Sequence, residues 1–188
     1  MLYAMPLADP GSGVAATKTV TVTGTATAAG TISLYVGYEL VQVGVEASEA
    51  ESDIAGHIAA AINADVDLPV TAQAALGVVT VTSKHKGVIG NDLTINVNLL
   101  GAANGQELPG GVSVAVADGT AGTGVPDIEE AFAALKEEPF EFIALPYSDK
   151  TSLDAAKAAM AERWAYNVQL YGHVYSASRG AVEDLLEI

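Results

Sequence analysis

The sequence predicts a mixed α/β protein in which an antiparallel β domain is inserted into an incomplete α/β domain. Residues 17–118 are rich in Thr, Val and Gly and have the alternation of β-strands, whereas after residue 119 helical and strand patterns alternate. A short motif, Ala-Met/Leu-Pro-x-x-Asp, occurs both at residues 4–9 and at residues 144–149. If both copies end strands of one sheet, the α/β domain comprises residues 1–13 and 119–188, and the β domain comprises residues 14–118.

The expected β domain begins with residues 17–23, in which Val and Thr alternate strictly and so face opposite sides of a strand. Gly30–Val36 and Glu39–Val45 repeat this alternation around Gly37 and Tyr38, a two-residue connection typical of a tight hairpin. Further strands are expected at four places: 70–75, 78–83, 93–99 and 112–117.

One helix interrupts these strands. Ser48 followed by Glu51 matches a capping box, and Ile54, Ile58 and Ile62 recur every fourth residue. We therefore expect an amphipathic helix that ends near Asn63.

The α/β part begins after a glycine-rich joint at 119–124, which we expect to be flexible. Its expected elements are a helix over 126–137, a strand over 140–145, a helix over 151–166, a strand over 168–175 and a helix over 180–188. Thr151 with Asp154 matches a second capping box. Because the sequence starts in a strand pattern and stops in a helical one, we expect a piece of a longer protein.

Composition excludes several classes of function. The 188 residues carry a net charge of −15, whereas binders of nucleic acid or anionic membranes need a basic face. The absence of cysteine excludes disulfides, thiolate metal sites and a cysteine nucleophile. The sequence contains no run of 18 apolar residues and no signal-peptide pattern. We predict no nucleic-acid partner, no membrane partner and no cofactor.

Four candidate ligand sites before residue 119 have simpler interpretations. Residues 11–16 match G-x-G-x-x-A, but a strand follows them instead of the helix that a dinucleotide site requires. Residues 63–67 resemble the start of a calcium loop, but Leu68 and Ala74 occupy its glycine and glutamate positions. His57 has no second His or carboxylate four residues after it, which argues against a metal site on this helix. The basic cluster at 84–86 is expected in a hairpin.

A second group of polar residues follows the expected α/β strands, where ligands bind in such sheets. It comprises Asp9, Tyr147, Ser148, Asp149, Ser176, Ser178 and Arg179, with His173 inside the last strand. His173 and Ser176 point to opposite faces of that strand, and no G-x-S-x-G elbow presents a nucleophile. We expect these side chains to cap helices and form turns, and we predict no catalytic, cofactor-binding or metal-binding residue.

Acidic residues gather in the same part of the chain. Most are expected on the solvated faces of helices, but they remain a candidate surface for a basic partner. They are Glu129, Glu130, Glu137, Glu138, Glu141, Asp154 and Glu162.

Two segments resemble tail sheath proteins of contractile phages, most closely those of Mu-like phages and prophages. The segment KHKGVIGNDLTINV is similar to a strand entry of that family, and the stretch from ADGTAGTGVPDIEEAF to AAMAERW is similar to the start of its subtilisin-like domain. The resemblance is strongest over residues 84–179. It implies a three-layer, subtilisin-like core of which this chain holds a part.

The resemblance also implies a structural function without enzyme activity. Family members polymerise as hexameric rings around a tail tube, above a baseplate, and contract to deliver the genome. The implied location is the virion tail, assembled in the cytoplasm of a bacterial host. No Gly-Thr-Ser follows and no His begins a helix after Gly119, so a subtilisin-type site is not expected.

Two other functions remain open at this point. One is a hydrolase that uses the Ser, Asp and His residues at the strand ends. The other is an extracellular β module that binds glycans or cells, suggested by the Thr-rich strands.

Overall fold

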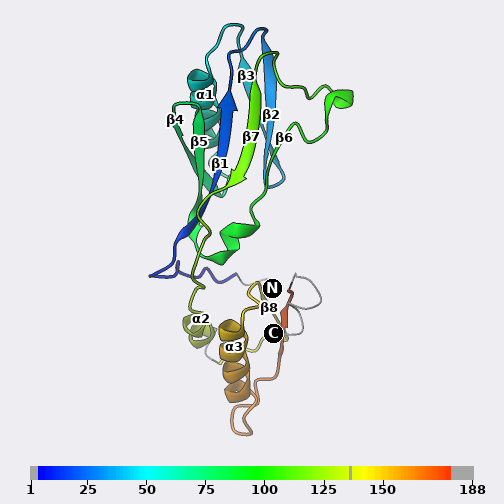
Figure 1. Cartoon of the computed structure of the whole chain (residues 1–188). Helices are drawn as coiled ribbons and strands as arrows, with labels where there is room; N and C mark the ends of the chain where they lie inside the picture. Colours follow the sequence, from blue (N-terminus) through cyan, green and yellow to red (C-terminus); the bar gives the residue numbers. More distant parts are fainter. Residues whose placement is uncertain (1–3, 136, 179–188) are drawn as a thin grey trace. The chain divides into compact units, whose positions relative to one another are not determined.

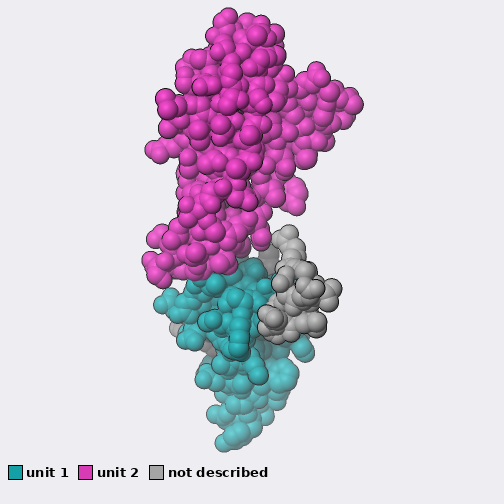
Figure 2. Space-filling model, viewed as in Figure 1, with its two compact units in different colours: residues 1–8, 125–188 teal, residues 9–124 magenta. Residues whose placement is uncertain are grey.

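In a computed structural model, which describes residues 4–135 and 137–178, the chain forms two compact units (Figures 1 and 2). Unit 1 combines Met1–Ala8 with Val125–Ile188, and unit 2 is Asp9–Gly124. The content is mixed α/β, with antiparallel sheets and three α-helices in the described residues.

Unit 2 contains two antiparallel sheets (Figure 1). The first has the order β4-β5-β1-β7, with β1 (Ala15–Thr23) between β5 (Val78–Lys86) and β7 (Ser113–Asp118), and β4 (Val70–Ala75) at an edge. The second has the order β3-β2-β6 and consists of β2 (Gly30–Val36), β3 (Glu39–Val45) and β6 (Ile95–Val97). Two 3-10 turns, η1 (Val88–Asp92) and η2 (Ala102–Asn104), lie in the connections.

The predicted hairpin and strand faces are confirmed. β2 and β3 pair through Val36 and Glu39, and Gly37 has a φ of 66°, a left-handed conformation that glycine adopts without strain. Val20 and Val22 of β1 are 0% and 1% exposed, so the alternation correctly identified the buried face. Such burial typically stabilises the fold by about 1.5–3 kcal/mol per large aliphatic side chain.

The helix α1 (Glu51–Ala64) packs against β3 of one sheet and against β4 and β5 of the other. Ile54, Ile58 and Ile62 are fully buried, as the four-residue spacing predicts. They join the valines of both sheets in one core, so the helix packs against both sheets.

The predicted capping box of α1 is wrong. The N-cap is Ala50, and no side chain caps the helix. Ser48 has a φ of 70° and donates its backbone N–H to Ala26, while Glu51 Oε2 accepts from the backbone N–H of Gly24 at 3.0 Å. Both residues therefore bind the β1–β2 connection, a long-range partner that competes with the local cap.

Several strand boundaries also differ from prediction. The strand expected over 93–99 is only Ile95–Val97, because Leu93 is the C-cap of η1 and Asn98 has a left-handed φ of 49°. The basic cluster 84–86 ends β5 and does not form a hairpin turn. β7 and β5 otherwise lie close to their expected positions, with β5 three residues longer.

Unit 1 contains a parallel two-stranded sheet, β8 (Phe142–Leu145) and β9 (His173–Ser176), together with α2 (Glu129–Leu135) and α3 (Lys150–Arg163). Its core comprises Ile128, Leu145 and Ala156, packed with side chains that include Phe132 and Val174. A helix between two parallel strands is the βαβ arrangement that the alternating pattern predicts.

Unit 1 corrects three expectations and leaves a fourth untested. Residues 4–9 form no strand, so the described part of the first motif adds no third strand. α2 begins at Glu129, where Asp127 accepts the backbone N–H, and not at Pro126. The strand expected from residue 168 begins only at His173, because backbone hydrogen bonds to Ala165 form a turn over 165–169. The helix expected over 180–188 lies outside the described residues.

The cap of α3 is Asp149, whose Oδ1 accepts from the backbone N–H of Ser152 at 3.0 Å. The capping function predicted for the Asp of the Pro-x-x-Asp motif is therefore confirmed here. The competing capping box of Thr151 and Asp154 is wrong, since α3 starts at Lys150 and Asp154 pairs with that lysine. The helix also ends at Arg163, before the expected residue 166.

Candidate functional site

The polar residues after β8 and β9 form contacts between the two strand ends. Ser176 Oγ donates a hydrogen bond of 2.7 Å to the carbonyl of Tyr147, directly after β8. Asp149 is occupied by the α3 cap described above. These contacts fix the edge of the sheet where a ligand would bind in an α/β fold.

The described residues bring no Ser, His and Asp into one hydrogen-bonded chain. His173 is exposed on β9, and its ring lies 6.1 Å from that of Trp164 and 6.5 Å from that of Tyr175. Asp9 belongs to unit 2, where it accepts from the backbone N–H of Lys86 and lies 3.1 Å from His85 Nδ1. Ser178 is exposed, and Arg179 lies outside the described residues.

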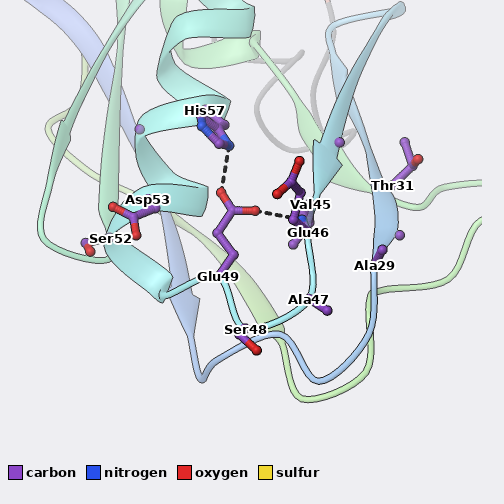
Figure 3. A pocket seen from close by; sticks show the side chains of 13 residues that line it. Ala29, Thr31, Val45, Glu46, Ala47, Ser48, Glu49, Ser52, Asp53 and His57 are labelled. Carbon is purple, nitrogen blue, oxygen red and sulfur yellow. Dashed lines mark hydrogen bonds and ion pairs between the residues drawn. The ribbon is translucent and has the colours of Figure 1, made fainter.

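A pocket of about 1160 Å³ opens in unit 2 beside the start of α1 (Figure 3). Its most buried charged group is Glu49, whose side chain is 9% exposed. Glu49 Oε2 accepts from the backbone N–H of Glu46 at 2.8 Å, and Oε1 lies 2.7 Å from Nδ1 of His57, which is 59% exposed (Figure 3). Oε1 of Glu49 is buried and accepts no other hydrogen bond, so the imidazole of His57 is its polar neighbour.

Sequence patterns did not indicate the Glu49–His57 pair. Helical spacing relates residues three or four apart, whereas Glu49 precedes α1 and reaches His57 from the loop. Ser48 and Ser52 line the same pocket, but in the described part of the chain neither forms a hydrogen bond with His57. The pair therefore holds the loop before α1 against the helix and presents no activated nucleophile.

The side chains of residues 63–67, the segment that resembles a calcium loop, form hydrogen bonds with backbone groups. The side-chain amide of Asn63 donates to the carbonyl of Ala72 at 2.7 Å and accepts from its N–H at 2.9 Å. Asp65 Oδ1 accepts from the N–H of Asp67, and Lys84 Nζ donates to the carbonyl of Val66. Among the residues described, no group of three or more His, Cys, Asp or Glu side chains could hold a metal ion.

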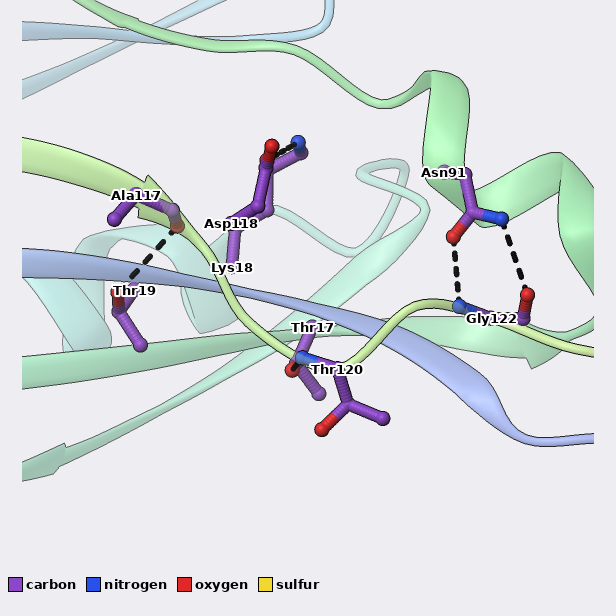
Figure 4. A network of polar contacts seen from close by, with 8 residues as sticks. All are labelled: Thr17, Lys18, Thr19, Asn91, Ala117, Asp118, Thr120 and Gly122. Carbon is purple, nitrogen blue, oxygen red and sulfur yellow. Dashed lines mark hydrogen bonds and ion pairs between the residues drawn. The ribbon is translucent and has the colours of Figure 1, made fainter.

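The segment 119–124, predicted to be a flexible joint, is hydrogen bonded along its length (Figure 4). Thr17 Oγ1 accepts from the N–H of Thr120, and the side-chain amide of Asn91 binds both backbone groups of Gly122. Val14 and Thr123 exchange two backbone hydrogen bonds of 3.0 Å. The first and last parts of unit 2 therefore lie side by side. Lys18 and Asp118 form an ion pair in the same region.

The acidic residues of unit 1 are exposed along α2, α3 and the loop before β8. A 2.6 Å hydrogen bond from Lys150, reinforced by its charge, holds the pKa of Asp154 below its ordinary value. No helix in the described ranges has the length and apolarity needed to cross a membrane.

The side-chain geometry does not identify a function, but comparison with known proteins identifies a similar protein. No protein-family profile matches it. It is 33% identical over 179 residues to the Mu-like prophage FluMu tail sheath protein of Haemophilus influenzae. This chain is similar to a segment of a tail sheath protein. The alignment covers 95% of the chain but 36% of the relative, so the chain spans about a third of that protein's length.

The similarity confirms the resemblance to Mu-like tail sheath proteins that the sequence motifs indicate. Because it extends over nearly the whole chain, it includes the Thr-rich β strands as well as the α/β segment. The name of the relative describes a structural component of a phage tail and no enzyme activity.

Proposed function

We propose that this chain is a structural, non-enzymatic segment of a contractile tail sheath subunit. The observation that carries the proposal is the 33% identity over 95% of the chain. In the full-length protein, the subunits form hexameric rings around a tail tube, above a baseplate, and contract to deliver the genome. The sheath assembles in the host cytoplasm and becomes part of the virion tail.

The proposed architecture assigns the two units different positions. Unit 1 belongs to the incomplete three-layer, subtilisin-like core, interrupted near residues 13 and 119 by the β domain. Unit 2 is placed on the outside of the sheath, where an insertion does not obstruct packing between rings. Its adjacent ends at Val14 and Thr123 support this arrangement, because an insertion with neighbouring ends disturbs its host domain little.

Contacts made by the candidate catalytic residues support the absence of enzyme activity. Ser176 Oγ donates to a backbone carbonyl, and the ring of His173 lies near those of Trp164 and Tyr175. Neither arrangement activates a nucleophile, which requires a base in hydrogen-bond contact. Fluorophosphonate labelling should therefore leave the protein unmodified, and labelling at Ser176 would support the hydrolase alternative.

Electron microscopy of the full-length protein tests the structural function. With its cognate tail tube, the protein should polymerise into sheath-like tubes, whereas persistent monomer in the presence of the tube would contradict the proposal. A variant in which residues 14–123 are replaced by a short Gly-Ser linker provides the matched test of position. It should still assemble but lose density on the outer surface, and failure to assemble would argue that unit 2 joins neighbouring subunits.

A further inference from the structure

The second sheet of unit 2 has an open edge at β3. The sheet has the order β3-β2-β6, so β3 pairs with a strand on one side only. Its seven residues include no Pro and no Lys, the residues that often prevent pairing at a sheet edge. By contrast, β4 at the edge of the other sheet is occupied where the side chain of Asn63 binds both backbone groups of Ala72. β3 is therefore an edge that another strand can extend.

The register of the hairpin identifies the unpaired groups of this edge. Because the connection between β2 and β3 has two residues, the flanking Val36 and Glu39 form a hydrogen-bonded pair. Hydrogen-bonded and non-hydrogen-bonded pairs alternate along an antiparallel ladder. The backbone N–H and C=O groups of Leu40, Gln42 and Gly44 therefore point away from β2.

The contacts on the far side of β2 have the same phase. Ser33 lies opposite Gln42, and it directs its N–H and its carbonyl away from β3, to the side chain and the N–H of Asn98. Across the described residues, no hydrogen bond from another element occupies the outward backbone groups of β3. The edge is thus free along its length.

The pocket of unit 2 lies where this edge ends (Figure 3). Gly44 and Val45 line it from β3, and Gly56 and His57 line it from α1. The two glycines keep it open, since a Cβ on either residue would meet no atom within 4 Å. Extended peptides add to exposed sheet edges, where main-chain hydrogen bonds give affinity and neighbouring pockets give specificity. The edge of β3 and the pocket beside it supply both components.

The lining of the pocket determines the charge of a peptide that fits. It includes the carboxylates of Glu46, Glu49 and Asp53 and contains no Lys or Arg. Glu49 is held by His57, whereas Glu46 and Asp53 are exposed. An acidic surface is complementary to a basic partner, and it repels a second copy of a chain whose net charge is −15.

We propose that the open edge of β3 binds an extended segment of a basic partner protein. The segment adds to the sheet as a strand beside β3 and places a Lys or Arg side chain in the acidic pocket. The proposal is independent of the sheath function, since it rests on the free backbone groups of β3, the adjoining pocket and the charge of its lining.

A labelled peptide tests the proposal on the 188-residue chain. The probe is Lys-Thr-Val-Thr-Val-Lys, which alternates as a strand does, and fluorescence anisotropy measures its dissociation constant. The peptide Glu-Thr-Val-Thr-Val-Glu should bind at least about tenfold more weakly, because its charges are reversed. The basic peptide with its central amides N-methylated should also lose affinity, because it cannot pair with β3. Equal binding of the three peptides, or no saturable binding of the basic one, would overturn the proposal.

Two charge reversals locate the binding site. Glu46→Lys changes a pocket residue that lies outside the helix, and it should weaken binding of the basic peptide by about tenfold. The matched control is Glu107→Lys, an equal change of net charge at an exposed residue that does not line the pocket. An equal loss of affinity in both variants would overturn the proposal, because it would show attraction by net charge alone.

Amide hydrogen exchange on the unsubstituted chain distinguishes strand addition from attraction between charges. Val41 and Val43 donate to β2, so their amides should exchange slowly with or without peptide. The outward amides of Gln42 and Gly44 should exchange faster in the free chain and become protected when the basic peptide is bound. Unchanged exchange at Gln42 and Gly44 under saturating peptide would overturn the proposal.

Discussion

At the scale of single residues, two asparagine side chains in unit 2 form hydrogen bonds with backbone groups that no neighbouring strand pairs with. The amides of Asn63 and Asn91 each bind the N–H and the carbonyl of one distant residue, Ala72 and Gly122. This is the pairing that an adjacent strand would otherwise supply. Asn91 thereby fixes the segment that leaves the unit, and Gly122 allows that segment to approach closely.

The close approach at Gly122 predicts a large effect from a small substitution. A Cβ on Gly122 would lie 2.3 Å from the carbonyl oxygen of Gly87, a backbone atom that cannot move aside alone. Gly122→Ala should lower the free energy of unfolding by about 1–3 kcal/mol. The matched control, Gly44→Ala, meets no atom within 4 Å and should change stability little. Urea denaturation measures both, and equal values for the two variants would contradict the steric explanation.

A second prediction at this scale concerns the Lys150–Asp154 pair on α3. Its carboxylate is stabilised by the lysine, so Lys150→Gln should raise the pKa of Asp154 towards the ordinary value of 3.8. The charge of Lys157 lowers this pKa less than Lys150 does, so Lys157→Gln should raise it less. NMR titration of the carboxyl carbon measures both shifts. Because the folded pKa is lowered, the contribution to stability is present at neutral pH and is lost as the pH falls through that pKa.

At the scale of elements, helices and turns show how local conformation and long-range contacts compete. α1 has a strong apolar stripe, yet its first turn lacks a side-chain cap because Glu51 binds Gly24. By contrast, α3 is capped by the Asp149 side chain but buries fewer side chains than α1. Packing compensates for the missing cap in α1, since most helix stability in proteins comes from tertiary contacts.

Gly56 in α1 predicts a stabilising substitution. A Cβ there meets no atom within 4 Å, and alanine has the higher helix propensity. Gly56→Ala should raise the free energy of unfolding by about 0.5–1 kcal/mol. Gly37→Ala is the control, because it also has free space but requires a φ of 66°, and it should destabilise by about 1–2 kcal/mol. Opposite shifts in thermal midpoint are expected, and a loss of stability in Gly56→Ala would refute the argument.

At the scale of the whole molecule, the large core lies entirely within unit 2. Every buried side chain of that cluster comes from residues between Val20 and Val112. The hydrogen bonds between Val14 and Thr123 close the unit where the chain enters and leaves it. The core of unit 2 is therefore built from its own residues, and its two ends form backbone hydrogen bonds with each other.

This organisation predicts that residues 9–124 fold alone. The isolated segment should show a cooperative urea transition and dispersed amide NMR signals, since it retains both sheets and α1. A variant that lacks residues 9–13 and 124 should differ little, because the Val14–Thr123 pair is retained. A segment that ends at residue 112 is the contrasting control, since it removes β7 from the side of β1 and should fold poorly. Collapse of residues 9–124 without dispersed signals would show that the unit depends on other parts of the chain.

The candidate site was predictable in part. Alternation within β9 correctly separates His173 from Ser176, because that period depends only on backbone geometry. The Pro-x-x-Asp motif correctly indicates the cap at Asp149, a contact across three residues. The contact of Glu49 with His57 and the hydrogen bond of Ser176 were not predicted, since those contacts join separate elements.

The sequence by itself determined the strand faces, the hairpin at Gly37, the buried stripe of α1 and the similarity to a sheath protein segment. These features depend on neighbours in the chain or on identity with a relative. Only the tertiary structure decided that the β strands divide into two sheets, that Glu51 binds Gly24 and that residues 119–124 are tied to β1 and η1. The physical reason is that each of these contacts joins residues far apart in the chain, where packing and hydrogen bonding outweigh the local preference.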